Sequence, residues 1–265
     1  MNFKFKTKGA KYKVSTAVIF LILLFFLTSR FIFNAPTEDE NTNLRTPVEF
    51  NSGTLEMTDR TYFSDDHMLE IDFMVTEVSS ELPPKLKAVV KEKSDQNKEY
   101  NPELIKIKDD FYVLFVRGLP EDWKSVSVQI VDENSEDNSL LDKVYSSSAK
   151  TKATDVFVKK NKDFYEAKYI DIKIKDNLKL IQDEEKKQQK LNVEITQLHT
   201  QNGSLKEDLE YQIGEEKEQT KSRIESNQSD IQSKKESIEE SKKTCAELEK
   251  RIALLKKRKS NLILD

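Results

Sequence analysis

Few residues of this 265-residue chain are of the types that carry out chemistry. It contains one cysteine, Cys245, and two histidines, His67 and His199, and neither histidine has the Glu-x-x-His or Cys-x-x-Cys neighbours of a metal site. The five glycines stand too far apart to build a phosphate-binding loop or a dinucleotide fingerprint. Carboxylates are abundant, so no single pair is marked as catalytic. We therefore predict no enzymatic activity, no cofactor and no bound metal.

Two further features each have a structural and a functional interpretation. Cys245 falls at a position that faces a partner helix, so it is either a small buried side chain, which we favour, or the site of an interchain disulfide in an oxidising exterior. The basic run 256–259 either complements a helix C-terminus, which we favour, or contacts an acidic polymer or lipid head group. Nucleic acid is not expected, because basic and aromatic residues are not interleaved.

The N-terminal segment predicts a membrane anchor. Residues 14–33 are 20 residues with one charge, Arg30, and at about 1.5 Å per residue they span roughly a 30 Å hydrocarbon core. Residues 1–13 carry no acid and five lysines, which place this end in the cytoplasm: Lys4, Lys6, Lys8, Lys11 and Lys13. A cleaved signal peptide is disfavoured by the bulky Phe33 near the only plausible cleavage site. We predict a basic tip (1–13), a transmembrane signal-anchor helix in membrane lipid (14–33) and a linker (34–44), in a single-pass cell-membrane protein with an extracytoplasmic C-terminus.

Residues 45–160 predict a small β domain. From His67 to Val78 apolar and polar residues alternate, as in a half-buried strand, whereas residues 111–116 (FYVLFV) are apolar on both faces, as in a central strand. Short strands separated by turn residues over this length are typical of an antiparallel β-sandwich, immunoglobulin-like in architecture. Trp123 is expected to have a core role. The other predicted strands are 54–63, 85–93, 103–108, 124–132, 140–146 and 154–158.

Residues 161–265 predict a long C-terminal coiled-coil helix. With Ala167 at heptad position a, nine of the 13 a and d positions up to Leu209 are apolar in a mostly charged stretch. A second register, displaced by one residue, begins near Ile213, beside Gly214, so a bend is expected there. The predicted seam residues are Ile174, Ile181, Leu191, Ile195, Leu198, Asn202, Leu205, Leu209, Ile224, Ile231, Ile238, Cys245, Leu248, Ile252 and Leu255.

Two arrangements of this tail are open. The heptad spacing runs unbroken through residues 201–204 (QNGS), which favours one continuous helix and treats Asn202 as a polar a residue that fixes register. Isoleucine at a with leucine at d then favours a parallel homodimer. The alternative is a helical hairpin, because QNGS is also a turn sequence and residues 204–207 (SLKE) read as a capping box.

We predict that the protein is a membrane-anchored extracytoplasmic scaffold that dimerises through its coiled coil and organises a cell-envelope complex of the secretion, conjugation or division type. Its partners would be a second copy and unidentified envelope proteins. In layout it also resembles the adaptor subunits of exporters, which implies an accessory role in export, although those subunits return to a β domain after a helical hairpin. An enzyme with an unrecognised carboxylate site is the third alternative.

Overall fold

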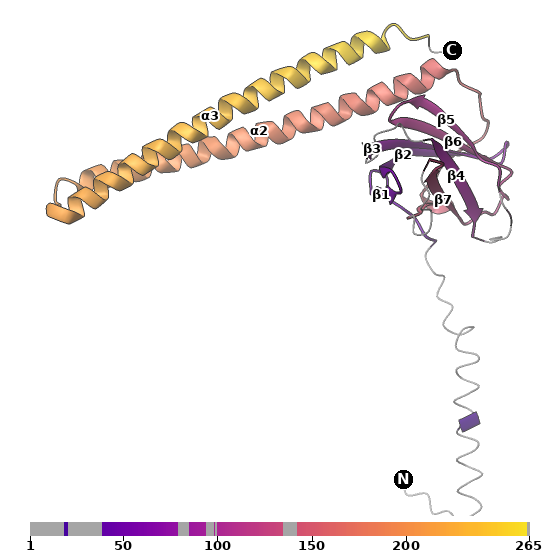
Figure 1. Cartoon of the computed structure of the whole chain (residues 1–265), viewed down its shortest axis with the longest axis horizontal. Coiled ribbons are helices and arrows are strands. Elements are labelled where there is room, and N and C mark those ends of the chain that lie inside the picture. The colour runs from indigo at the N-terminus through magenta and orange to yellow at the C-terminus, as the bar shows by residue number, and fades with distance from the viewer. Residues whose placement is uncertain are drawn as a thin grey trace, which may run out of the picture. The chain divides into compact units, whose positions relative to one another are not determined.

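The computed structural model describes residues 19–20, 39–78, 85–93, 98, 100–134 and 142–263. Strands come first and two long helices last (Figure 1). The elements are β1 (Pro47–Phe50), β2 (Gly53–Phe63), β3 (Met68–Val78), β4 (Leu86–Glu92), β5 (Glu103–Lys108), β6 (Phe111–Arg117), β7 (Ser125–Asp132), β8 (Val144–Ser147), the 3-10 helix η1 (Ser148–Lys150), β9 (Lys152–Thr154), α2 (Lys162–Asp208) and α3 (Gly214–Lys259). The chain divides into two compact units, Met1–Leu104 with Leu114–Asp155, and Ile105–Val113 with Val156–Asp265.

The strands form two sheets. One has the order β1-β2-β3-β6-β5 with β9 parallel to β2, and the other has the order β4-β7-β8. The turn between β2 and β3 is short and includes His67 at φ 47°, and it keeps these consecutive strands paired in one sheet. In an immunoglobulin-like sandwich the third strand leaves the sheet of the second. The immunoglobulin-like prediction is therefore wrong, because strand spacing alone does not specify which strands pair.

Most predicted strands are confirmed within a few residues of their ends. Every residue of β6 from Phe111 to Val116 is buried, as expected of a central strand. In β3 both faces are covered, and Glu70 and Asp72 are buried, so this strand is not half-exposed as predicted. Trp123 is buried and its ring lies 5.3 Å from that of Tyr62, which confirms its core role.

The predicted and observed strands differ at the two ends of the strand region. The strand β1 was not predicted, and the strand expected over residues 154–158 ends at Thr154. Beyond that point, the side chains of Val156 and Val158 are 59% and 61% exposed. These valines have the residue type of a strand but no neighbouring strand to pack against, which local sequence does not reveal.

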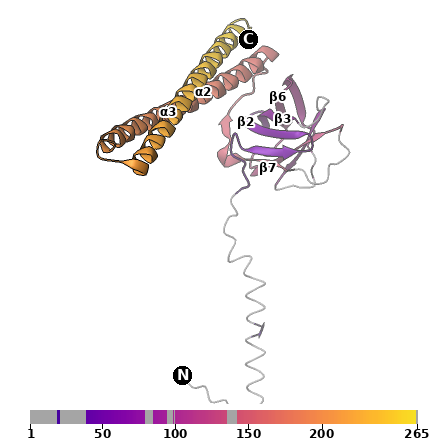
Figure 2. The same ribbon diagram turned by 60° about the vertical axis from the view of Figure 1, so that its left-hand side comes forward.

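The C-terminal region is a helical hairpin. Helices α2 and α3 lie side by side and run in opposite directions (Figures 1 and 2). Gln188 contacts Ser241, and nearer the turn Asn202 contacts Asn227, as an antiparallel pair requires. The continuous helix is therefore wrong and the hairpin alternative is confirmed.

The turn lies at residues 209–213, and not at Asn202-Gly203 as the hairpin alternative assumed. Gly203 is accommodated inside α2, where a glycine costs only about 1 kcal/mol. The chain breaks instead where the two heptad registers are displaced by one residue, because a straight continuation would rotate the apolar stripe by about 100°. Gly214 starts α3 at φ 60°, a conformation that glycine adopts without strain.

The predicted transmembrane helix must be corrected. Within the described ranges, no helix is long and apolar enough to cross a membrane. A spanning helix needs about 20 mostly apolar residues, whereas α2 and α3 carry charges along their whole length. Of residues 14–33 only Ile19 and Phe20 are described, so the rest of that span and the basic tip lie outside the described residues. The fold that is supported consists of β-sheets and two C-terminal helices, and the single-pass, signal-anchored membrane localisation is not supported.

The hairpin predicts a short distance between spin labels placed at Gln189 and Glu240. Both positions are exposed and flank the Gln188–Ser241 contact. Packed helix axes lie about 10 Å apart, whereas one continuous helix would separate these positions by about 76 Å. Cys245 is first replaced by serine so that only the introduced cysteines carry spin labels. Pulsed electron paramagnetic resonance should then give a single short distance between the two labels. A distance above about 60 Å would contradict the hairpin.

Candidate functional site

The hairpin buries the predicted seam between its own two helices. Ile195, Ile231 and Ile238 form a buried cluster against which Leu191 and Leu198 pack. The predicted seam residues that are buried are Ile195, Asn202, Leu205, Ile224, Ile231, Ile238, Leu248 and Ile252, and those that are half-buried are Ile174, Ile181, Leu191, Leu198, Leu209, Cys245 and Leu255. A parallel homodimer through the same residues stays a prediction, and it would require this intrachain pair to open.

Polar layers interrupt the apolar seam at defined heights. The Asn227 side-chain amide donates to Asn202 Oδ1 at 2.8 Å, so Asn202 has a polar partner across the hairpin. One heptad farther from the turn, the Lys234 ammonium group lies 2.5 Å from a carboxylate oxygen of Glu194, which precedes the seam residue Ile195. Asn202, Asn227 and Lys234 occupy a or d positions, and paired polar groups at such positions reduce stability but favour one alignment over shifted ones. These layers therefore fix the register of α2 on α3.

Cys245 lies in another polar layer. Its Sγ accepts from the Gln188 amide nitrogen at 3.8 Å, and the same nitrogen donates to Ser241 Oγ at 2.9 Å. Burial, with nearby carboxylates led by Glu184, raises the pKa of the Cys245 thiol. The side chain is half-buried in the seam, the position that both interpretations assigned to it. An interchain disulfide stays untested.

At its base, the hairpin is held by the Glu166 carboxylate. Glu166 is 8% exposed, and its two oxygens bind Lys108 Nζ at 2.5 Å and Arg258 Nε at 2.7 Å. Burial alone would raise the pKa of Glu166, but the hydrogen bonds from Lys108 and Arg258 outweigh burial and hold the pKa below its ordinary value. One carboxylate thus joins the end of β5, the start of α2 and the end of α3.

A second contact at the base surrounds Asp110, which lies between β5 and β6. Lys173 Nζ lies 2.7 Å from an Asp110 carboxylate oxygen, and the Tyr169 hydroxyl donates to the same oxygen at 3.3 Å. Burial and the Asp110 charge raise the pKa of Tyr169 to about 12. The Tyr169 ring also lies 5.6 Å from that of Phe111. The start of α2 is therefore anchored on the β5–β6 turn by apolar and ionic contacts together.

The chain after α3 returns to the first turn of α2. Asn161 caps α2 by accepting the Phe164 backbone N–H, and its amide nitrogen donates to the Ile263 carbonyl at 2.8 Å. The Ile263 N–H donates to Asp163 at 3.0 Å. In the basic run 256–259, Arg258 and Lys259 pair with acids of α2, Glu166 and Asp171. Half of that run is thus used in closing the hairpin.

The far end of the hairpin carries exposed apolar side chains. Residues 209–213 connect the helices, and Tyr211 and Ile213 in this connection are each 86% exposed. The Tyr211 N–H donates to the Asp208 carbonyl at 3.0 Å, so the connection has an ordered backbone. Tyr211 is not among the residues that the sequence marks as functional, and its only signal in the sequence is its position as an aromatic residue beside the displaced register. The turn brings these residues to the end of the hairpin.

Acidic and basic side chains of the strand region serve structural roles. Asp132 accepts from the Ser52 hydroxyl at 2.5 Å and from the Lys85 N–H at 2.9 Å, and Glu92 accepts the Lys124 N–H at 3.1 Å. Such hydrogen bonds order strand ends, and a reacting group is not needed to explain them. Within the described ranges, no group of three or more His, Cys, Asp or Glu side chains is placed to hold a metal ion.

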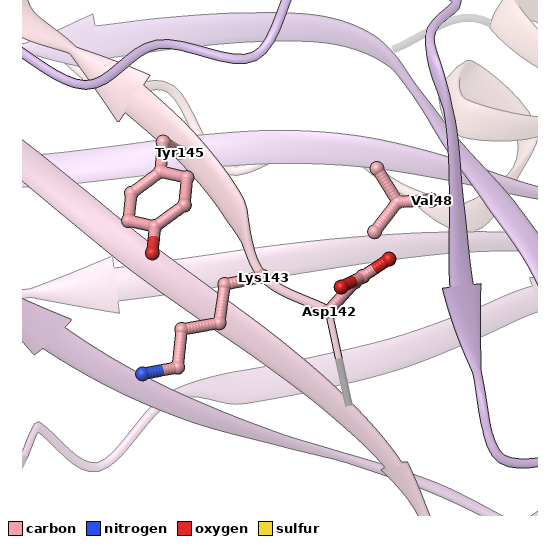
Figure 3. Close-up of a pocket in the computed structure, with 4 residues that line it drawn as sticks. All are labelled: Val48, Asp142, Lys143 and Tyr145. Atoms are coloured by element: carbon pink, nitrogen blue, oxygen red, sulfur yellow. The ribbon is translucent and has the colours of Figure 1, made fainter. Parts of the chain in front are cut away.

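A shallow hollow on the first unit is lined by Val48, Asp142, Lys143 and Tyr145. Figure 3 shows the Asp142 carboxylate turned toward Val48 and the Lys143 side chain extending away from it. Burial, followed by the charge of Glu40, raises the pKa of the Tyr145 hydroxyl. Because the side chains of Asp142 and Lys143 point in different directions, their charged groups do not converge on a common point. The hairpin is the better candidate for a functional surface.

Comparison with known protein families gives a match. A family model described as PXO2-05-like domain matches residues 47–187. No match is found among curated proteins. The matched range begins with β1 and ends inside α2, so it includes the Glu166–Lys108 and Asp110–Lys173 contacts at the base of the hairpin, whereas Arg258 lies outside it.

Replacing Glu166 by glutamine should destabilise the hairpin by roughly 1–2 kcal/mol at neutral pH, below the full cost of breaking a buried pair because Arg258 is half exposed. The pKa of Glu166 is depressed in the folded state, so its contribution is present above the unfolded value of 4.5 and is lost as the pH falls through the folded value. The difference between Glu166→Gln and wild type should therefore shrink between about pH 5 and pH 3 in denaturant unfolding followed by helical circular dichroism. A difference independent of pH would contradict this role.

Replacing Asn202 and Asn227 together by leucine should raise the free energy of unfolding by about 1 kcal/mol or more, because a polar layer becomes apolar. The same change removes a register constraint, so the distance distribution between labels at Gln189 and Glu240 should broaden. The control is Thr200→Leu, which adds an apolar side chain at an exposed position outside the seam. Loss of stability with an unchanged distribution would show that this pair does not set the register.

Proposed function

The chain belongs to the PXO2-05-like domain family, and we propose that it is a non-enzymatic scaffold whose helical hairpin binds a partner at a set distance from its base. The observation that carries this proposal is the closure of the heptad seam within one chain. Because the apolar residues of the seam face each other, α2 and α3 form a stable rod without a second copy. At 47 residues, α2 is about 70 Å long.

The base of the hairpin supports a spacing role. A rod sets a distance only if one end is held at a defined orientation, and Glu166 and Asp110 hold this end through charged contacts to three segments of the chain. The asparagine and Glu194–Lys234 layers hold the register along the length. The predicted location in the cell envelope rested on the predicted transmembrane helix, so it is not part of this proposal.

A second candidate function is the adaptor-like accessory subunit of an exporter. The observation that favours it is the helical hairpin, which is the element that such adaptors extend toward a partner. The two candidates differ in consequence: loss of an exporter adaptor abolishes export of a substrate, whereas loss of a scaffold removes other proteins from a complex. Export assays in a deletion strain, together with the composition of the purified complex, discriminate between them.

The test of the scaffold function shortens the rod while it keeps the remaining seam residues in heptad phase. Deleting residues 189–202 and 227–240 removes two facing heptads from each helix, preserves the heptad phase and shortens the hairpin by about 21 Å. Partner proteins are identified in the source cells by crosslinking mass spectrometry from the exposed Lys206 near the turn. We expect the shortened protein to stay helical while these crosslinks move to other partner residues or disappear.

The matched control keeps the length and changes only the surface of the same segments, with Val193→Ser and Lys235→Ser at exposed positions. This control should crosslink as the wild type does. If the shortened hairpin gives the same crosslinks and the same assembly as the wild type, the distance is irrelevant and the scaffold proposal is wrong.

A further inference from the structure

The end of the hairpin, here called the tip and defined as residues 206–217, carries two highly exposed large apolar side chains. Tyr211 and Ile213 are each 86% exposed, the highest values among the large apolar side chains of the described ranges. Single exposed apolar residues are ordinary on a protein surface, whereas adjacent ones at the end of a projecting element mark an interaction site.

Ile213 also contradicts the local rules of helix formation. It occupies the N-cap of α3, where Ser, Thr, Asp or Asn is preferred because the side-chain oxygen accepts an N–H of the first turn. Ile213 makes no such hydrogen bond, so the stabilisation that a side-chain cap gives is absent here. Natural sequences depart from such rules mainly at functional sites. An isoleucine at this position is explained if its side chain is needed by a partner.

The tip is acidic as well as apolar. Its sequence contains two lysines and five acids, Glu207, Asp208, Glu210, Glu215 and Glu216, for a net charge of −3. All five acids are exposed. Within the described part of the chain, Glu207, Asp208 and Glu210 form no ion pair. Some acids elsewhere on the hairpin, such as Glu194 and Asp171, pair with lysines.

This charge selects the chemistry of the partner. A second tip of the same sign and an anionic lipid surface would both be repelled at close range. A pocket that buries Tyr211 and Ile213 and carries Lys or Arg around its rim would gain from both the apolar burial and the charge. We propose that the tip docks into such a basic-rimmed apolar pocket of a partner protein. This inference rests on the scaffold function and specifies the partner that the scaffold holds.

The first experiment crosslinks the partner protein to a residue of the tip. The full chain is expressed in the source cells with the photocrosslinking amino acid benzoylphenylalanine in place of Tyr211 or, as the control, in place of Leu254, which is 68% exposed on the shaft of α3. We expect one defined adduct from position 211 that is absent from position 254. No adduct at 211, or an adduct that contains a second copy of this chain, would overturn the proposal.

The second experiment measures the affinity of the captured protein for the purified full chain by calorimetry. Tyr211→Ser with Ile213→Ser should weaken binding by more than about tenfold, as truncation of central interface anchors does. The matched control, Val193→Ser with Leu254→Ser, removes two exposed apolar side chains from the shaft and should change affinity less than about twofold. Equal affinity of the tip variant and the wild type would overturn the proposal.

The third comparison tests the charged rim. Replacing Glu207, Asp208 and Glu210 by their amides should weaken binding and reduce its dependence on salt. Unchanged salt dependence would rule out a basic rim. Failure of the tip is distinguishable from failure of the scaffold: if position 254 gives the defined adduct and position 211 does not, the hairpin still binds a partner, but through its shaft.

Discussion

The antiparallel contact between α2 and α3 is the interaction on which the C-terminal unit depends. Most of the buried apolar side chains of these highly charged helices lie on one heptad stripe of each helix. The stripes bury each other through Ile195, Ile231 and Ile238, and an isolated helix of this composition would have little else to stabilise it. Opening the contact would expose both stripes at once, so the hairpin forms or is lost as a unit.

A uniform apolar stripe would permit several alignments, because shifting one helix by a heptad again places apolar residues opposite each other. The polar layers remove this freedom. A shift by one heptad would separate Asn202 from Asn227 and Glu194 from Lys234 together, leaving polar groups against apolar ones. Glu166 adds a third constraint at the base, since its two oxygens are satisfied only when the end of α3 lies beside the start of α2.

The two ends of the hairpin therefore have opposite properties. At the base, Glu166 and Asp110 are paired with basic side chains, and the half-buried Tyr169 has a pKa raised to about 12. At the tip, the acids are exposed, Ile213 replaces a capping residue, and Tyr211 faces solvent. This difference between the two ends suits a rod that is fixed at its base and binds a partner at its tip. It follows from the place of the turn more than from the composition of either helix.

The sequence alone determined the periodic features. Alternation of apolar residues located most strands, and the heptads identified the seam residues of both helices, including the one-residue displacement near Gly214 where the chain reverses. Periodicity is local, because the geometry of a helix or strand links each side chain to its near neighbours in the chain. Only the tertiary structure decided that the seam pairs within one chain, that β3 stays beside β2, and that Glu166 joins Lys108 and Arg258. A continuous helix and a hairpin contain the same heptads, so the choice depends on contacts between residues far apart in sequence, and local patterns carry no information about those contacts.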